Sequence, residues 1–366
     1  MPPATILFVF GTRPEGIKLA PVVDELRRDP ESFDVRVCVT GQHREMLAQV
    51  LDAFGITPDI DLGLMQPDQN LTDVAAAVLR QVRRVIDETA PRVVVVQGDT
   101  TSAMAAGLAA FYARVDVAHV EAGLRSGNVQ APWPEEVNRR LLSVVTRFHF
   151  APTEDARQHL LREGAAEVFV TGNTVIDALL RVREVELPFL SNRRLVLVTG
   201  HRRENFGAGM ESICHALADL VRAFDDIEIV YPVHLNPNVQ QPVRAILGNS
   251  ERVHLIEPVD YATFVTLMKR STLILSDSGG VQEEAPSLGK AVLVMRDTTE
   301  RPEAVRAGNV RLVGTSRERI VSEAGMLLRD PAKLAEMAQV RHPFGDGNAS
   351  KRIADVLRAA VVSSAP

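Results

Sequence analysis

The chain has 366 residues, of which 46% are hydrophobic and 24% are charged, a composition typical of a globular protein with two domains. Its formal net charge of -6 argues against nucleic acid as a partner, because a phosphate backbone requires a basic surface. The two cysteines, Cys38 and Cys214, indicate neither a disulfide framework nor a metal site, and the apolar run at the N-terminus is too short for a signal peptide or a membrane span. We therefore expect a cytoplasmic protein without a metal, which binds any anion through local groups.

The first half of the chain repeats one pattern, a buried apolar strand followed by a polar turn and a helix. Strands are predicted at residues 5–10, 33–40, 92–96, 115–120 and 148–151, and helices at 71–89 and 102–112 among others. The recurrence, at intervals of roughly 30 to 35 residues, is typical of βαβ units. It predicts a doubly wound parallel sheet, whose ligand lies at the carboxyl ends of the strands.

The turn after the first strand carries two basic residues. Thr12 and Glu15 fit a helix capping box, with Pro14 in the first helical turn. Arg13 lies in this turn and Lys18 lies one turn into the helix, so both can point into the crevice above the strand ends. Solvated side chains are the alternative at both positions.

Three acidic residues are expected near the same edge of the sheet. Asp99 and Glu121 directly follow two of the predicted strands, whose carboxyl ends meet at one edge. The polar segment 125–140 contains the sequence PWPEE and brings Glu135 to a helix start. The alternative is that an acid at this position only caps the helix and has no role in the site.

The second half of the chain repeats the opening theme. Strands are predicted at residues 195–199, 227–231, 253–256, 272–275 and 291–295, and the segment 200–204 places Gly, Arg and Glu as residues 11–15 do. His201 and His234 follow the first two of these strands. We therefore expect two Rossmann-like domains, one of residues 1–172 joined by a C-terminal helix at 350–366, the other of residues 173–349.

A glycine-rich turn, SDSGG at residues 276–280, precedes a helix expected to begin near residue 281. Gly279 and Gly280 allow the backbone to approach a ligand, and the N–H groups at a helix start suit a diphosphate. Glu283 and Glu284 follow one turn later, where a carboxylate can hold the hydroxyls of a ribose. An ordinary strand-to-helix turn explains the same residues equally well.

Several common site types are missing from the sequence. No GxGxxG fingerprint with a ribose acid follows the first strand, and a Walker A motif, GxSxG and HExxH do not occur. What remains is a nucleotide diphosphate held by backbone and arginine beside carboxylates from the first half. We expect these groups to meet in an interdomain cleft, the layout of a nucleotide-sugar enzyme.

A series of segments between about residue 8 and residue 315 supports this interpretation: FGTRPEGIKLAP, TGQHREML, GDTTS, HVEAGLRSG, PWPEEVNRR, GNTVIDAL, TGHRREN, YPVHLNPNV, SDSGGVQEEAPSLGK and RDTTERPEA. Through them the sequence resembles the non-hydrolysing UDP-N-acetylglucosamine 2-epimerases. The resemblance implies an α/β, GT-B-like fold with two Rossmann-like domains, a homodimer, and reversible conversion of UDP-GlcNAc into UDP-ManNAc that supplies ManNAc for surface polysaccharide.

The chemistry of such a reaction limits its mechanism. Carbon 2 of the sugar has no adjacent carbonyl, so direct deprotonation is too costly, and oxidation of a neighbouring carbon would need a nicotinamide. Elimination of UDP to 2-acetamidoglucal, with readdition on the other face, needs no cofactor but two proton-transfer groups and a further charge. The resemblance assigns these catalytic roles to Asp99, Glu121, Glu135 and His201, the last near the leaving diphosphate.

The resemblance also assigns binding residues by motif. Arg13 and Lys18 would contact the nucleotide side, and Ser278, Gly279 and Gly280 would contact the diphosphate. Glu284 would bind the ribose, and Phe264 and Arg301 would lie in the uracil and phosphate region. In bacterial members, a second UDP-GlcNAc acts as an activator among residues that match Gln42, His43, Arg44, Glu136, Arg202 and His234. Activation by substrate is therefore a hypothesis, which hyperbolic kinetics without a lag would contradict.

Several alternatives share the same nucleotide site. A GT-B glycosyltransferase would require an acceptor, and a 2-epimerase of a diacetamido or uronic UDP-sugar would differ only at the far end of the sugar. A hydrolysing variant would release free ManNAc and UDP. A non-catalytic nucleotide-sugar sensor would have no need of all three carboxylates.

Overall fold

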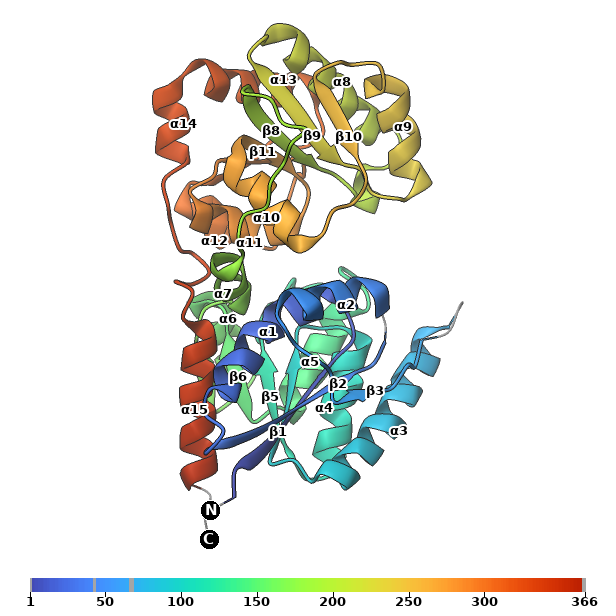
Figure 1. Ribbon diagram of the computed structural model, residues 1–366, viewed down its shortest axis with the longest axis vertical. Coiled ribbons are helices and arrows are strands. Elements are labelled where there is room, and N and C mark those ends of the chain that lie inside the picture. The colour runs from blue at the N-terminus through green and yellow to red at the C-terminus, as the bar shows by residue number, and fades with distance from the viewer. Residues whose placement is uncertain (1, 42–43, 66–68, 364–366) are drawn as a thin grey trace. The chain divides into compact units, whose positions relative to one another are not determined.

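The computed structural model describes residues 2–41, 44–65 and 69–363, and the chain divides into two compact units (Figure 1). The first unit comprises Met1–Leu180 and Phe344–Pro366, and the second comprises Arg181–Pro343. A division at residue 172 was expected from the sequence. In the structure, helix α7 (Thr174–Arg181) belongs, except for its last residue, to the first unit and not to the second.

The first unit is built on a seven-stranded parallel sheet with the order β3-β2-β1-β4-β5-β6-β7. Its strands are β1 (Ala4–Phe10), β2 (Phe33–Val39), β3 (Ile60–Asp61), β4 (Val93–Gln97), β5 (Asp116–Val120), β6 (Phe148–Ala151) and β7 (Val168–Val170). The predicted strands all occur, with bounds shifted by a residue or two. The two-residue β3 was not predicted, because it has no apolar run of its own.

Helices cover both faces of this sheet (Figure 1). Its helices are α1 (Arg13–Arg27), α2 (Arg44–Ala53), α3 (Leu71–Thr89), α4 (Thr101–Tyr112), α5 (Glu135–Val145), α6 (Glu154–Arg162), α7 and α15 (Ala349–Ser363). Phe8 and Phe10 of β1 pack with α1, α2 and α15, whereas Leu7 and Val9 pack with α3, α4 and α5. Burial on both faces explains why β1 is a continuous apolar run.

The C-terminal helix α15 is part of the first unit. Ile353 and Leu357 are fully buried in the same cluster as Phe8. At its N-terminus the carboxylate of Asp177, on α7, accepts hydrogen bonds from the backbone N–H groups of Ala349 and Ser350 at 3.1 and 2.8 Å. This buried cap ties α7 and α15 together.

The second unit repeats the topology in a six-stranded parallel sheet with the order β10-β9-β8-β11-β12-β13. Its strands are β8 (Arg194–Thr199), β9 (Ile227–Pro232), β10 (Val253–Ile256), β11 (Ser271–Ser276), β12 (Val292–Val294) and β13 (Val310–Leu312). Its helices are α8 (Ala208–Ala223), α9 (Pro237–Leu247), α10 (Tyr261–Arg270), α11 (Gly279–Glu284), α12 (Pro302–Ala307), α13 (Arg317–Arg329) and α14 (Pro331–Met337), with short 3-10 turns at Arg203–Asn205 and Ala285–Leu288. Both sheets therefore have the strand order of a Rossmann fold.

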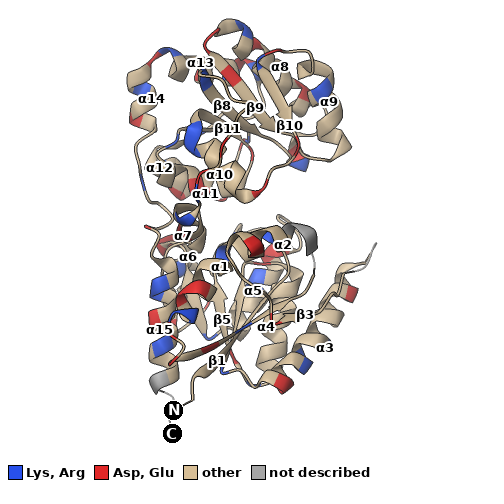
Figure 2. Ribbon diagram, in the orientation of Figure 1, with Lys and Arg blue, Asp and Glu red and all other residues tan. Residues whose placement is uncertain are grey.

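Acidic and basic residues are interspersed along the ribbon of each unit (Figure 2). Within the part of the chain that the structure describes, no helix combines the length and the apolarity needed to span a bilayer.

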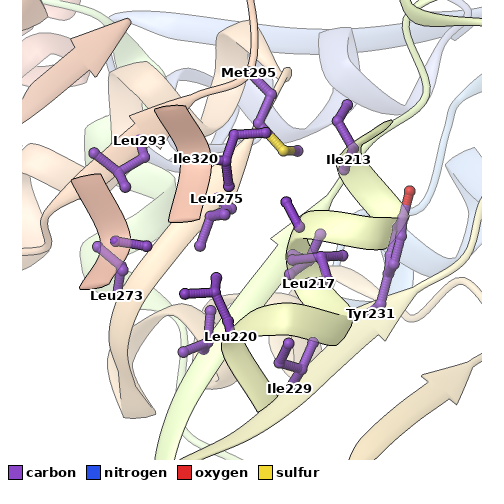
Figure 3. Packing of buried hydrophobic residues seen from close by; sticks show 14 of the residues in the cluster. Ile213, Leu217, Leu220, Ile229, Tyr231, Leu273, Leu275, Leu293, Met295 and Ile320 are labelled. Atoms are coloured by element: carbon purple, nitrogen blue, oxygen red, sulfur yellow. The ribbon is translucent and has the colours of Figure 1, made fainter. Parts of the chain in front are cut away.

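The core of the second unit packs α8, α9 and α13 against one face of its sheet (Figure 3). Leu217 and Leu220 of α8 meet Ile229, Leu275 and other strand residues in this cluster. At its edge lies the buried ring of Tyr231, whose hydroxyl donates to the carbonyl of Gly200 at 3.0 Å. The core therefore fixes the backbone at the carboxyl end of β8.

Candidate active site

Each sheet has one point where the strand order reverses, and the candidate residues gather there. In the first unit β1 lies beside β4, and in the second β8 lies beside β11. At such a switch point the loops after the two neighbouring strands diverge and leave a crevice that binds ligands. The loops in question are those that contain Arg13 and Asp99 in one unit, and His201 and Ser278 in the other.

The turn after β1 is joined to the turn after β4 by Glu15. Its carboxylate accepts from the N–H groups of Gly11 and Thr12 at 2.9 and 2.7 Å, and from the Thr100 hydroxyl at 2.7 Å. Thr12 in turn accepts from the N–H of Glu15, so the predicted capping box is confirmed. Burial raises the pKa of Glu15 above its usual value, although all three donors oppose that rise. The two turns are thereby fixed to one another.

Glu121 is held by three side chains at the end of β5. Its carboxylate pairs with the ammonium of Lys18 and accepts from the amides of Gln97 at 3.1 Å and Asn173 at 3.3 Å. The backbone of Glu121 is left-handed, with φ 65°, a conformation that costs a non-glycine residue about 1 kcal/mol or more. Such strain is typical of a side chain whose direction matters for function.

Asp99 is held by a different cation. The guanidinium of Arg139 on α5 contacts its carboxylate at 2.5 Å, and the Asn138 amide donates to the backbone carbonyl of Asp99 at 3.0 Å. Arg139 also lies 3.4 Å from the fully buried carboxylate of Glu136. Burial disfavours the charge on Glu136, but the N–H of Ser126 and the guanidinium of Arg139 outweigh it and keep the pKa of Glu136 below its usual value.

Glu135 is the half-buried first residue of α5. Its neighbour Glu136 anchors Arg139, so the predicted acid pair at this helix start divides into one buried structural acid and one more accessible acid. Glu136, which the resemblance places around an activator, therefore contacts the cation that holds Asp99.

In the second unit, two imidazoles and a buried carboxylate lie together. The rings of His201 and His234 stack with centroids 5.7 Å apart and planes 19° from parallel. Asp277 is fully buried and accepts from the backbone N–H groups of His201 and Arg202, both at 2.9 Å, through Oδ2. Its Oδ1 lies 3.4 Å from Nδ1 of His201. Burial lowers the pKa of His201, and the Asp277 charge works in the opposite direction.

The glycine-rich turn differs in detail from the prediction. Helix α11 begins at Gly279 rather than near residue 281, because Ser278 is extended and both glycines already have helical backbone angles. The guanidinium of Arg301 packs directly against Gly279, since an added Cβ would lie 3.0 Å from Cζ of Arg301. That guanidinium is oriented by Glu283, which accepts from Nε at 2.9 Å. The structure therefore brings Arg301 onto the turn assigned to the diphosphate.

Glu284 lies next to Glu283 and is also buried. Its carboxylate accepts from the hydroxyl of Tyr261 on α10 at 2.6 Å, and Phe264 is half-buried one turn further along that helix. The residues assigned to the ribose and to the uracil thus belong to adjacent elements.

The residues assigned to an activator are only partly visible. Gln42 and His43 lie outside the described residues, and Arg44 is the first residue of α2. Arg202 is half-buried beside His201.

Several functional candidates were not found from the sequence. They are Gln97, Asn138, Arg139, Asn173, Tyr261, Asp277 and Glu283 as a partner of Arg301. Each lies within a segment that carries the resemblance or beside a predicted acid. In the sequence, these candidates could be recognised only as polar residues at the end of a buried strand or on the first turns of the next helix. The partner that each side chain contacts depends on the strand order, which the sequence pattern does not show.

Comparisons with known proteins point to one family. Residues 24–358 match a family model described as UDP-N-acetylglucosamine 2-epimerase. A curated UDP-N-acetylglucosamine 2-epimerase of Escherichia coli K12 is 55% identical, over 96% of this chain and 98% of the relative. A crystal structure of UDP-GlcNAc 2-epimerase from Neisseria meningitidis bound to UDP-GlcNAc is 47% identical, with a TM-score of 0.90 over 96% of this chain and 99% of that one.

A more distant structure, from Methanocaldococcus jannaschii in complex with UDP-GlcNAc and UDP, is 32% identical with a TM-score of 0.79, over 97% of this chain and 99% of that one. The architecture of two Rossmann-like parallel-sheet units is GT-B-like, as predicted. The match covers most of the chain and the structural agreement extends through both units, so the chain belongs to the UDP-N-acetylglucosamine 2-epimerase family.

Proposed function

We propose that this protein interconverts UDP-GlcNAc and UDP-ManNAc by inverting carbon 2 of the sugar. The observation that carries the proposal is the pair of acids at adjacent strand ends, Glu121 fixed by Lys18 and Asp99 fixed by Arg139. An epimerase must move protons on two faces of one carbon, and two separately oriented carboxylates suit that requirement. The substrate bound in the Neisseria structure supports the choice of sugar nucleotide.

The reaction proceeds by elimination and readdition. One carboxylate takes the proton from carbon 2 as the bond from carbon 1 to UDP breaks, and the electron pair of that bond leaves with the diphosphate. The products are 2-acetamidoglucal and UDP. Protonation of carbon 2 on the opposite face and return of UDP to carbon 1 complete the inversion, so no oxidant is consumed. Glu135 stabilises the positive charge that develops on the sugar ring.

The second unit holds the nucleotide. The turn at Ser278 and the guanidinium of Arg301 bind the diphosphate. The protein as a whole carries a net negative charge, so these local donors must stabilise the negative charge of the diphosphate. Glu284 accepts from the ribose hydroxyls, with Tyr261 orienting its carboxylate. His201 donates to the departing diphosphate.

The test is to incubate the protein with UDP-GlcNAc in heavy water, without cofactor or acceptor, and to follow the sugar by proton NMR. We expect UDP-ManNAc to form and deuterium to enter carbon 2 of both sugars. Glu121→Gln and Asp99→Asn should each lower this exchange by about 100-fold or more. An unlabelled and unchanged substrate contradicts the proposal, and free ManNAc with UDP as the final products would indicate hydrolysis instead.

We propose further that the protein is a homodimer formed through helices α4 and α5. Phe111, Tyr112, Leu141 and Val144 are large apolar residues exposed on these two helices, and Val144 is 83% exposed. Exposed apolar clusters on one face are typical of subunit interfaces. Leu141→Glu should give a monomer by light scattering, whereas Val340→Asp, at an equally apolar but isolated surface position, should not. A monomeric wild-type protein would contradict this.

The reaction takes place in the cytoplasm and supplies ManNAc units for a surface polysaccharide, with a second UDP-GlcNAc as activator. The Methanocaldococcus structure is a complex with both UDP-GlcNAc and UDP, which supports the idea that an enzyme of this family binds more than one nucleotide. Initial rates should then rise sigmoidally with UDP-GlcNAc, and conversion from UDP-ManNAc alone should show a lag. Hyperbolic curves without a lag would exclude the activator.

A further inference from the structure

Asp277 is a fully buried acid of the second unit that the proposed mechanism does not use. It follows β11 and lies at the switch point beside β8, directly below the turn that carries His201. Oδ2 accepts three hydrogen bonds, from the N–H groups of His201 and Arg202 and from the Asn205 amide at 3.1 Å. This oxygen fixes the turn after β8.

The other oxygen of Asp277 has a different environment. Oδ1 is buried and accepts no hydrogen bond from any residue that the structure describes, although Nδ1 of His201 lies only 3.4 Å away. A buried carboxylate oxygen without a donor is costly. A small rotation of the imidazole would supply the donor, provided that Nδ1 carries the proton.

We propose that Asp277 is a positioning residue for His201: it accepts a hydrogen bond from Nδ1–H, so that Nε2 takes up the second proton and the resulting imidazolium donates from Nε2 to the leaving diphosphate. The inference rests on the proposed function, because it assigns the partner of a group in that reaction. Only one ring nitrogen can face the carboxylate, and the bond at one nitrogen decides which tautomer the neutral ring adopts.

The charges around His201 explain why it needs such a partner. Burial lowers its pKa, and the neighbouring Arg202 and the stacked His234 lower it further. Asp277 is the one group among these that raises it. The Nδ1 of His234 accepts from the N–H of Asn236 at 3.1 Å, so His234 has no proton on that nitrogen when neutral and cannot replace the carboxylate.

The backbone before His201 is equally restrained. The Tyr231 hydroxyl donates to the carbonyl of Gly200, and an added Cβ on Gly200 would lie 2.9 Å from that hydroxyl. With the main chain fixed on both sides, the imidazole can turn only about its side-chain bonds. The position of its ring is therefore decided by what Asp277 offers.

The first measurement uses the wild-type protein and needs no substrate. Long-range proton–nitrogen NMR of histidine-labelled protein, with His201 assigned by its loss in His201→Gln, identifies the tautomer of the neutral ring. We expect the proton on Nδ1. A neutral ring with the proton on Nε2 would overturn the proposal, whether or not the protein proves to be an epimerase.

The second measurement compares Asp277→Asn with Asn205→Ala. An asparagine can keep its oxygen toward the three N–H donors and then presents an N–H to Nδ1, which opposes protonation of the imidazole. For Asp277→Asn we expect a lower titration midpoint for His201, and we expect kcat/KM to begin its fall at high pH at a lower pH than in the wild type (the alkaline limb of its pH profile). We also expect kcat to be reduced about tenfold or more, and the KM for UDP-GlcNAc to change much less.

Asn205→Ala removes a neutral donor from the same carboxylate but keeps the charge. We expect it to lower thermal stability without moving the His201 titration or the pH limb. If both variants move the limb equally, Asp277 acts only on the structure of the turn and the proposal is wrong. The same holds if folded Asp277→Asn leaves the titration unchanged; if it does not fold, the tautomer of the wild type still decides.

Discussion

Gly279 and Gly280 are adjacent in the sequence but meet different neighbours. A Cβ on Gly279 would lie 3.0 Å from Cζ of Arg301, whereas a Cβ on Gly280 would make only ordinary contacts, at 3.8 Å, with Glu284 and Ser278. The guanidinium is the mobile end of a long side chain, so the first substitution moves Arg301 and leaves the fold intact. The two glycines thus separate the role of Arg301 from that of the turn itself.

We expect Gly279→Ala to raise the KM for UDP-GlcNAc and the Kd for UDP about tenfold, the loss of one charge-assisted hydrogen bond to phosphate. Gly280→Ala leaves Arg301 in place, so it is the comparison for crowding of the turn alone and should weaken binding less, with a slightly more stable helix. Calorimetric titration with UDP checks both. Equal weakening in the two variants would mean that Arg301 does not contact the diphosphate.

Gln97 tests whether the direction of Glu121 matters. Its amide donates to Glu121 Oε2 at 3.1 Å, and its side chain is buried. Gln97→Met keeps the volume and removes a hydrogen bond to a charged group, which is worth about 1.5–3 kcal/mol. We expect kcat to fall about tenfold or more with little change in KM, because the proposed mechanism places Glu121 at the reacting carbon and not at the nucleotide. A change confined to KM would contradict that placement.

At the scale of elements, helix α15 depends on a cap that lies 172 residues away in the sequence. Asp177 accepts from two N–H groups at the start of α15 and from the Ser350 hydroxyl at 2.5 Å. Asp177→Ala leaves buried donors without a partner and should lower the free energy of unfolding by about 2–4 kcal/mol.

Ser350→Ala provides the comparison for that variant, because it removes only the hydroxyl and should cost about 1 kcal/mol. Urea unfolding followed by circular dichroism measures both. Asn173, four residues before Asp177, donates to Glu121, so the activity of the folded Asp177→Ala protein shows whether loss of the cap also disturbs that carboxylate. Stabilities that differ little between the two variants would mean that α15 is held by its apolar face alone.

At the scale of the whole molecule, the buried histidines of the first unit make the folded protein less stable as the pH falls. His119 is fully buried, and its Nε2 donates to the carbonyl of Gly98 at 2.7 Å. Burial lowers the pKa of His119 from 6.5 to about 3. As the pH falls below 6.5, the unfolded chain binds this proton and the folded chain does not, so stability is lost progressively down to about pH 3.

We expect the free energy of unfolding to fall by about 1.4 kcal/mol for each pH unit below the unfolded pKa through this residue alone. His119→Gln can still donate to Gly98 but cannot be protonated, so its stability should depend less on pH in the same range. Urea unfolding of both proteins at about pH 7 and about pH 5.5 gives the difference in slope. Parallel slopes would show that His119 does not cause this loss of stability.

The sequence determined the strands, the turns and the family of this protein, because each strand buried on both faces is a continuous apolar run and the chemistry follows directly at its end. The same local signals placed the capping box of Thr12 and Glu15, and Asp99, Glu121 and His201 at strand ends. They placed the start of α11 two residues late, because two glycines are weak evidence for a helix.

Only the tertiary structure decided which of these groups act on one another. Lys18 meets Glu121 across 103 residues, Arg139 meets Asp99 across 40, and Asp277 meets the backbone of His201 across 76. Each pairing follows from the strand order, in which β4 lies between β1 and β5, and β8 lies beside β11. Periodicity along the chain carries no information about that order, since the neighbours of a parallel strand are set by crossover helices and by burial of the whole sheet.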